Sequence, residues 1–244
     1  MWYQEILNEA NSELAKLSFA GEVAAVYNPL EYARAPHELY LKRFTKNKRR
    51  KALLLGMNPG PWGMAQTGIP FGEVAAVRDW LGIKAEVGKP DLEHPKRPIE
   101  GFACSRSEVS GRRLWGWAAE AFETPQAFFK HYIVINYCPL VFMGESGKNI
   151  TPDKLPVAER KPLEMICDRM LRAWVEALKP ERLVGVGGFA AKRLQTVFPE
   201  QKGEVGQILH PSPASPLANR GWAPKVDEQL RALGLPVGKG ISGL

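Results

Sequence analysis

The sequence contains few cysteines and few histidines. The three cysteines lie far apart and form no C-x-x-C pair: Cys104, Cys138 and Cys167. Three scattered thiols build neither a disulfide framework nor a four-thiolate cluster, so we expect them to be reduced and mostly buried. The four histidines show no metal-ligand spacing: His37, His94, His131 and His210. The sequence therefore predicts no metal site, and we expect no cofactor.

Long apolar runs are absent as well. No stretch has the length and hydrophobicity of a transmembrane helix, and we expect a soluble, intracellular protein that does not bind membranes. Residues 1–19 alternate apolar side chains with Glu5, Glu9 and Glu13. This spacing predicts an amphipathic helix and excludes the uncharged core of a signal peptide.

The excess of positive charge is small. The chain has 33 Lys and Arg against 26 Asp and Glu, a formal net charge of +7 with a pI near 9.3. This is a modest bias towards polyanions. The densest basic run, LKRFTKNKRRK at residues 41–51, carries seven basic side chains in its last ten positions. It is interpreted as a solvated surface segment, as a patch that meets phosphate or, in a eukaryote, as an import signal.

Length and patterning predict one α/β domain over residues 1–244. At 45% hydrophobic content the chain can bury a substantial core. Four short apolar runs are typical of strands buried on both faces, and helical patterns separate them. The runs are 52–55, 132–135, 183–186 and 205–209, and the main helical patterns are 111–122, 163–178 and 189–197. The alternation predicts a three-layer α/β/α fold whose central four-stranded parallel sheet is covered by helices on both sides.

A polar, glycine-rich or proline-rich loop follows each run. The loops contain GMNPG, NYCPL, GVGG and HPSP. Ligands bind beyond the carboxyl ends of open parallel sheets, so we expect the four loops to meet at one mouth. Asn58, Asn136 and His210 stand in these loops and are candidates for chemistry, together with Phe71. The alternatives are structural: a loop-capping asparagine, an exposed histidine and a core phenylalanine.

The run GVGGFA at residues 185–190 formally fits the dinucleotide fingerprint G-x-G-x-x-A. That fingerprint needs an acidic residue at the end of the next strand, where His210 stands instead. A nicotinamide or flavin site is therefore disfavoured. The remaining interpretations are a helix N-terminus that holds a phosphate and a plain tight turn between strand and helix.

Four long motifs resemble those of one known family. They are GMNPGPWGMAQTGIPFGE at 56–73, CSRSEVSGRRLWG at 104–116, NYCPL at 136–140 and HPSPASPLANRGW at 210–222. In these motifs the chain resembles the single-strand-selective monofunctional uracil-DNA glycosylases, a branch of the uracil-DNA glycosylase superfamily. The resemblance runs from about residue 20 to about residue 230, which is taken as the core of the domain.

The resemblance implies a four-stranded parallel sheet between helices and a hydrolase for the bond between uracil and deoxyribose. Such enzymes leave an abasic site and use a largely dissociative route, in which the base departs as an anion. By position, Asn58 matches the residue that orients the attacking water. His210 matches the histidine that donates a hydrogen bond to uracil O2, where negative charge accumulates.

The resemblance also assigns the uracil-binding residues. Phe71 matches the aromatic that stacks on the flipped base, and Asn136 matches the asparagine that reads the Watson–Crick edge, accepting from N3–H and donating to O4. The backbone around Gly60 and Met64 matches the wall near uracil C5, where the family excludes thymine and admits 5-hydroxymethyluracil.

The loop after His210 matches the wedge that fills the hole left by the base. It comprises Pro211, Ser212, Pro213, Ala214, Ser215, Pro216 and Leu217. Vertebrate members carry a large basic residue at the position of Ala214, and a methyl group cannot fill a base-sized gap. Duplex opening is then expected to be weaker or to depend on neighbours such as Leu217.

The sequence thus predicts a monomeric glycosylase that acts on uracil in single- and double-stranded DNA, on the nucleoid of a prokaryote or in a eukaryotic nucleus. The alternatives are a mismatch-specific uracil/thymine glycosylase of a related branch and a non-catalytic protein that binds single-stranded nucleic acid through its basic run and Phe71.

Overall fold

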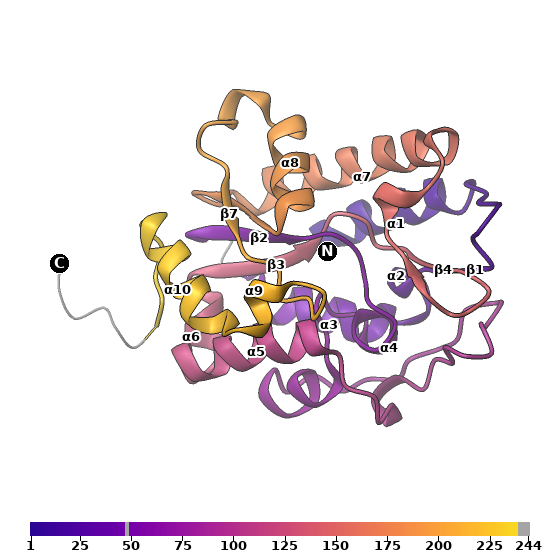
Figure 1. Ribbon diagram of the computed structural model, residues 1–244, viewed down its shortest axis with the longest axis horizontal. Coiled ribbons are helices and arrows are strands. Elements are labelled where there is room, and N and C mark those ends of the chain that lie inside the picture. The colour runs from indigo at the N-terminus through magenta and orange to yellow at the C-terminus, as the bar shows by residue number, and fades with distance from the viewer. Residues whose placement is uncertain (47–48, 239–244) are drawn as a thin grey trace.

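The computed structural model describes residues 1–46 and 49–238, and a four-stranded sheet lies at its centre (Figure 1). The strands are β2 (Ala52–Gly56), β3 (Tyr132–Asn136), β6 (Leu183–Val186) and β7 (Gly206–Ile208). Their order is β3-β2-β6-β7, and each neighbouring pair is parallel. The four predicted strands are confirmed to within one residue at each end.

Burial explains the aliphatic composition of the strands. Every residue of β2, β3 and β6 is buried, as is typical of a parallel sheet covered on both faces. The last strand differs, because Gln207 in β7 is exposed. The expectation that this run is buried on both faces is therefore wrong, because one face of β7 is open to solvent at Gln207.

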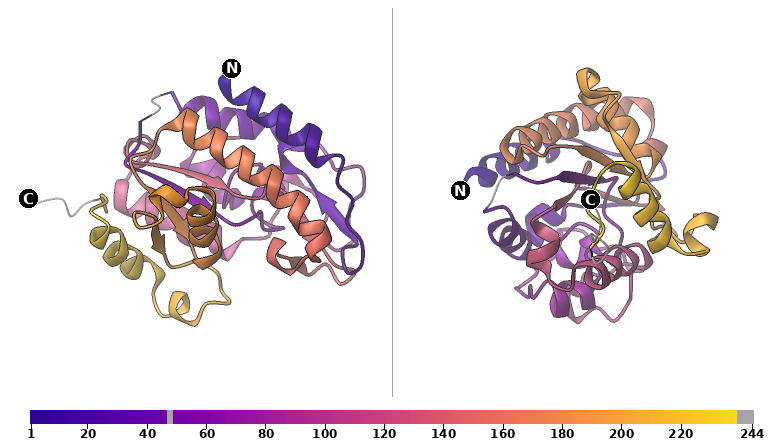
Figure 2. Two further views of the ribbon diagram at one scale, coloured as in Figure 1. Left: turned by 90° about the horizontal axis from the view of Figure 1, so that it is seen from above. Right: turned by 90° about the vertical axis from the view of Figure 1, so that its left-hand side faces the viewer.

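Helices cover both faces of the sheet (Figures 1 and 2). On one face lie α1 (Trp2–Leu14), α7 (Val157–Leu178) and α8 (Gly188–Val197), and on the other lie α3 (Arg34–Phe44), α5 (Val109–Phe122) and α6 (Pro125–Phe129). The Tyr40 hydroxyl of α3 donates to the Val134 carbonyl at 2.9 Å and so fastens this layer to β3. The predicted three-layer α/β/α fold is confirmed.

The helix boundaries differ from the predicted ones mainly at α7. This helix begins at Val157, six residues before the predicted start, and Pro162 lies inside it. The remaining helices are α2 (Pro29–Tyr32), α4 (Met64–Thr67), α9 (Pro216–Asn219) and α10 (Trp222–Ala232). A π-helical turn at Ala76–Trp80 and 3-10 turns at Gly101–Ala103, Pro152–Lys154 and Pro199–Gln201 complete the helical elements of the described residues.

A second, antiparallel sheet was not predicted. It consists of β1 (Ala25–Tyr27), β4 (Val141–Met143) and β5 (Asn149–Ile150), in the order β1-β4-β5. Strands of two or three residues are too short to show a period-2 pattern, which is why the sequence does not reveal them. The three cysteines are free and buried, as predicted. Within the described ranges, no helix combines the length and the apolar character needed to cross a membrane.

Candidate active site

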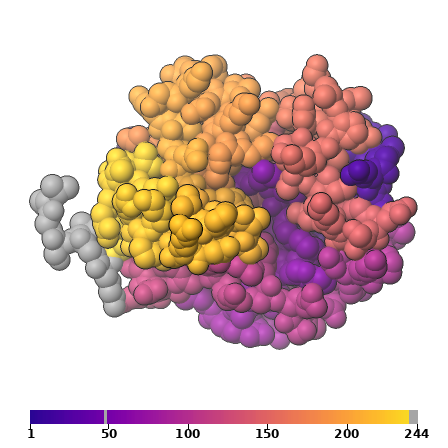
Figure 3. All heavy atoms as spheres, in the orientation of Figure 1, coloured from indigo at the N-terminus to yellow at the C-terminus, as the bar shows by residue number. Residues whose placement is uncertain are grey.

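The carboxyl ends of the four strands meet at one edge of the sheet, as predicted. Gly56 at the end of β2 pairs in register with Asn136 at the end of β3. Asn58 follows two residues after Gly56, and His210 follows two residues after β7. Figure 3 shows a hollow here. The purple segment after β2 lies at its floor, between the gold segment after β7 and the salmon segment before α7.

Gly56 leaves the space that brings Phe71 and Asn136 together. A Cβ atom at Gly56 would overlap the Asn136 amide oxygen and would lie 2.7 Å from Cε2 of Phe71. Phe71 itself has a positive φ of 53°, which is uncommon for a residue with a side chain. Its ring lies 6.0 Å from that of His210 between centroids. The structure thus brings Phe71 and Asn136 together at Gly56 and places His210 beside Phe71.

The side-chain amide of Asn136 is buried and only half satisfied. Its Nδ2 lies 3.3 Å from the Met64 sulfur, a weak acceptor, and its Oδ1 has no hydrogen-bond partner among the described residues. A buried polar atom without a partner is destabilising. A ligand that donates a hydrogen bond to Oδ1 removes this penalty and therefore binds more favourably.

Asn58 is held by its amide nitrogen. Nδ2 donates to the carbonyl of Leu140 at 3.3 Å and to that of Pro59 at 3.4 Å. These bonds orient the side chain and leave Oδ1 as the atom that can accept a hydrogen bond from a bound molecule. The acceptor of the first bond belongs to the NYCPL segment, so the loops after β2 and β3 are tied together through Asn58.

His210 is a neutral imidazole at neutral pH. Its Nδ1 accepts a hydrogen bond from the Ser212 amide at 3.1 Å, which leaves the proton of the neutral ring on Nε2. Burial lowers the pKa of His210 from 6.5 to about 4. Gly187, with a φ of +88°, makes room for this ring, since a Cβ there would lie 3.0 Å from the His210 Cβ. GVGG therefore contains the turn between β6 and α8 and borders His210.

Gly60 and Met64, the predicted wall residues, lie in the segment that includes Asn58, and Glu108 packs behind that segment. A Cβ at Gly60 would lie 2.6 Å from Glu108 Oε1, and one at Gly63 would overlap the same carboxyl group. Burial, with a smaller contribution from the Glu73 charge, raises the pKa of Glu108 to about 7. The sequence reasoning missed Glu108 although it stands in the CSRSEVSGRRLWG motif, because only its contact with the glycines reveals it.

The loop after His210 presents its tip to solvent. Pro213, Ala214, Pro216 and Leu217 are exposed, and Leu217 retains 58% of its accessible surface. The Ser215 hydroxyl accepts a hydrogen bond from the Ala218 amide and so caps α9. An exposed apolar side chain on a capped, proline-rich loop is a feature that a wedge between bases needs.

Two arginines that the sequence analysis did not single out lie beside the segment after Asn58. The guanidinium carbons of Arg97 and Arg106 lie 5.0 Å and 4.9 Å from the centre of the Trp62 ring, in the segment after Asn58. Cations over an indole face are attracted to the ring. These two arginines place positive charge near the mouth of the site. The sequence alone did not reveal this charge.

The basic run at residues 41–51 is partly consumed by internal contacts. Arg43 donates to the Leu81 carbonyl at 2.8 Å, Arg50 is buried, and Lys51 pairs with Glu181 at 2.9 Å. Residues 47–48 of this run lie outside the described residues. Within the described part, these contacts occupy three of the run's seven basic side chains, so the run is not a solvated segment throughout, and its roles as a phosphate-binding patch or import signal stay predictions.

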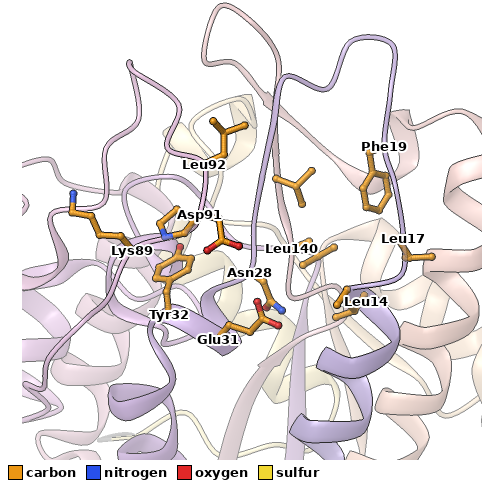
Figure 4. A pocket seen from close by; sticks show the side chains of 13 residues that line it. Leu14, Leu17, Phe19, Asn28, Glu31, Tyr32, Lys89, Asp91, Leu92 and Leu140 are labelled. Carbon is orange, nitrogen blue, oxygen red and sulfur yellow. The ribbon is translucent and has the colours of Figure 1, made fainter.

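A cavity of about 540 Å³ lies apart from the predicted site residues (Figure 4). It opens between the end of α1, α2 and residues 89–92, with Glu31, Asp91 and Tyr32 among its lining side chains. Leu140 connects it to the site through the carbonyl that accepts from Asn58, and Tyr32 does so by donating to the Ala65 carbonyl beside Met64. No cluster of three or more His, Cys, Asp or Glu suited to a metal ion occurs in the described ranges.

Comparison with known proteins identifies the family. The pattern of the uracil DNA glycosylase superfamily matches residues 43–231. The single-strand selective monofunctional uracil DNA glycosylases of Bos taurus and Rattus norvegicus are each 48% identical to this chain over 229 residues, covering 92% of it and 83% and 81% of the relatives.

A solved structure supports the fold. The crystal structure of wild-type Pedobacter heparinus SMUG2 superposes with a TM-score of 0.65 at 19% identity, covering 94% of this chain and 97% of that one. At this identity the likeness concerns the fold alone, while the much closer sequence relatives concern the family. The chain therefore belongs to the uracil DNA glycosylase superfamily, within the family of single-strand selective monofunctional uracil-DNA glycosylases.

Proposed function

We propose that this protein is a monofunctional uracil-DNA glycosylase that hydrolyses the N-glycosidic bond of uracil in DNA and leaves an abasic site. The observation that carries the proposal is the buried, unpaired Oδ1 of Asn136 beside Phe71. A hydrogen-bond acceptor next to an aromatic ring is what a flipped pyrimidine with an N3–H donor requires. Family membership supports the same reaction.

The uracil base stacks on Phe71, and Asn136 recognises its Watson–Crick edge. Asn136 Oδ1 accepts from N3–H, and Nδ2 leaves the weak contact with the Met64 sulfur to donate to O4. Cytosine presents an amino group at position 4, so two donors would face each other in the buried site. The backbone at Gly60 and Met64 borders C5, where a 5-hydroxymethyl group is accepted.

Bond cleavage moves negative charge onto the base. The Nε2–H of neutral His210 donates to O2 and stabilises this charge as it develops, and donors of this kind contribute about 3 kcal/mol in other enzymes. Asn58 Oδ1 accepts a hydrogen bond from the water that attacks the sugar. An amide suffices for this task because the sugar is already close to a cation when the water adds.

The DNA is held by positive charge near the mouth and opened by the loop after His210. Arg97 and Arg106 lie where flanking phosphates of the strand pass, and the exposed Leu217 enters the stack that the base has left. The single domain of residues 1–244 acts as a monomer on single- and double-stranded DNA, on a nucleoid or in a nucleus.

The test is an excision assay. Purified protein is incubated in EDTA, without cofactor, with an end-labelled oligonucleotide that contains one uracil, and the product is examined for an alkali-labile site. We expect cleavage after alkali with wild-type protein. Asn58→Ala should lose most excision and keep DNA binding, because the amide serves the water. Binding without excision by wild-type protein would instead identify a non-catalytic nucleic-acid binder, and release of thymine from a G·T pair would identify the mismatch-specific branch.

A further inference from the structure

Arg113 on α5 joins that helix to the loop after His210. Its Nη1 donates to the carbonyl of Pro211 at 3.0 Å and to that of Ser212 at 3.3 Å, and its Nη2 donates to Asn219 Oδ1 at 2.8 Å. Asn219 in turn donates to the Pro213 carbonyl at 2.9 Å. In Figure 1, α5 lies directly beneath α9, which begins at the end of this loop.

Prolines stiffen the loop and Asn219 donates to it, but its backbone amides form few of its hydrogen bonds. Pro211, Pro213 and Pro216 have no amide hydrogen, so half of the first six residues after His210 cannot donate a backbone hydrogen bond. Two bonds within the loop link the Ala214 amide to the Ser212 hydroxyl and the Ser215 amide to the Ser212 carbonyl. Arg113 supplies the contacts that come from outside the loop to its beginning.

The charge of Arg113 is not consumed by an acid. The acceptors of its three hydrogen bonds are neutral oxygens, and none of the ion pairs among the described residues includes Arg113. A guanidinium bound to carbonyl oxygens keeps its positive field, which at this surface attracts phosphate.

We infer that Arg113 is a positioning residue, which holds the segment from His210 to Asn219 in place through forked hydrogen bonds and thereby sets the position of His210 at one end and of the wedge at the other. The inference rests on the proposed function for its catalytic consequence. Its structural consequence, the restraint of the loop, is independent of any reaction.

Arg112 offers a matched control. It is the preceding residue on the same helix and carries the same charge, but its side chain donates to the Ser107 hydroxyl at 3.2 Å and makes no hydrogen bond to the loop. Arg112→Gln and Arg113→Gln therefore remove the same charge from neighbouring positions, and only the second removes the contacts with the loop.

The first measurement is hydrogen–deuterium exchange of the amides in residues 212–219. We expect faster exchange in Arg113→Gln than in wild-type protein, and wild-type exchange in Arg112→Gln. Equal exchange in all three proteins overturns the inference. Because exchange needs no turnover, this result stands even if the wild-type protein fails to excise uracil and the proposed function falls.

The second measurement is the single-turnover rate of uracil excision at saturating enzyme. Arg113→Gln should slow excision about tenfold on single strands, because the three hydrogen bonds of the guanidinium act on His210 only indirectly, and more on duplex DNA. Arg112→Gln should stay within about twofold of wild-type protein. Arg113→Lys keeps the charge without the fork, so it should bind DNA like wild-type protein and excise uracil as slowly as Arg113→Gln. A wild-type rate in Arg113→Lys would show that charge alone matters and would overturn the inference.

Discussion

Protonation of His210 should inactivate the enzyme only in distinctly acidic solution. The pKa of this residue falls from 6.5 to about 4 because its ring is buried, and its Nδ1 lone pair is engaged by the Ser212 amide. A proton on Nδ1 would break that hydrogen bond and reorient the ring. We therefore expect the excision rate to be constant from about pH 8 to about pH 5 and to fall as the pH approaches 4.

The same pKa predicts an effect on stability. Between pH 6.5 and 4 the unfolded chain takes up a proton on this histidine and the folded protein does not. The contribution of His210 to the free energy of unfolding is therefore highest above pH 6.5 and decreases as the pH falls, by about 3 kcal/mol in total for a pKa lowered from 6.5 to about 4. His37, whose pKa burial also lowers to about 4, adds a parallel decrease. The raised pKa of Glu108 acts in the opposite direction, since its stabilising proton is lost as the pH rises towards 7.

A variant separates His210 from these other groups. Urea unfolding of wild-type protein and His210→Gln from pH 4 to pH 8 should give a difference in unfolding free energy that changes by about 3 kcal/mol across the acidic range. Single-turnover excision by wild-type protein is measured at the same pH values. An excision rate that falls with a midpoint near 6.5, or one that rises as the pH is lowered, would refute the assignment of a neutral hydrogen-bond donor.

Three further substitutions test the remaining parts of the site. Asn136→Asp places an acceptor opposite position 4 of the base, so excision of cytosine should rise relative to uracil, and an unchanged ratio on folded protein would remove Asn136 from base reading. Ala214→Arg should raise the ratio of duplex to single-strand excision at fixed salt, because a larger side chain holds the base out of the stack. Ala214→Gln is its neutral control, and an equal gain on both substrates with no effect of Gln would mean that charge alone acts. Gly63→Ala should reduce excision strongly because its methyl group overlaps the Glu108 carboxyl group, and adding Glu108→Ala should restore part of the rate. Failure of the double variant to recover, measured on folded protein, would argue against that contact.

The sequence predicted the sheet because burial leaves a strong local signature. Every residue of β2, β3 and β6 is buried. Complete burial of a strand requires a short, mostly apolar run, and such runs separated by helical patterns are visible in the sequence. The second sheet left no such signature. Its strands pair Ala25 with Met143, residues far apart in the chain, over two or three residues each. Pairing between segments so far apart in sequence depends on the fold as a whole, and no local sequence pattern predicts it.

Some residues of the candidate site could likewise be predicted from the sequence, and others could not. Asn58, Asn136 and His210 could be predicted because each stands at the end of a strand or two residues after it, where topology brings side chains together. Glu108 and Arg113 could not, because both act through segments distant in sequence: Glu108 against the glycines after β2, and Arg113 against the carbonyls after β7. Their positions on or before α5 gave no indication of these partners.

The distribution of charge in the site accounts for the choice of its residues. Asn58 and Asn136 are amides, and burial keeps His210 uncharged, so the groups proposed to contact the base and the water carry no net charge at neutral pH. A charged group in this place would lose hydration without a fixed partner, whereas a dipole oriented in advance stabilises charge that develops only during the reaction. The positive charge stands outside, on Arg106 and Arg113, where we expect DNA phosphates to be its partners. Substitutions in the two groups should then separate cleanly: changes to the neutral groups should alter the rate at saturating enzyme, and the loss of Arg106 should mainly alter the salt dependence of DNA binding.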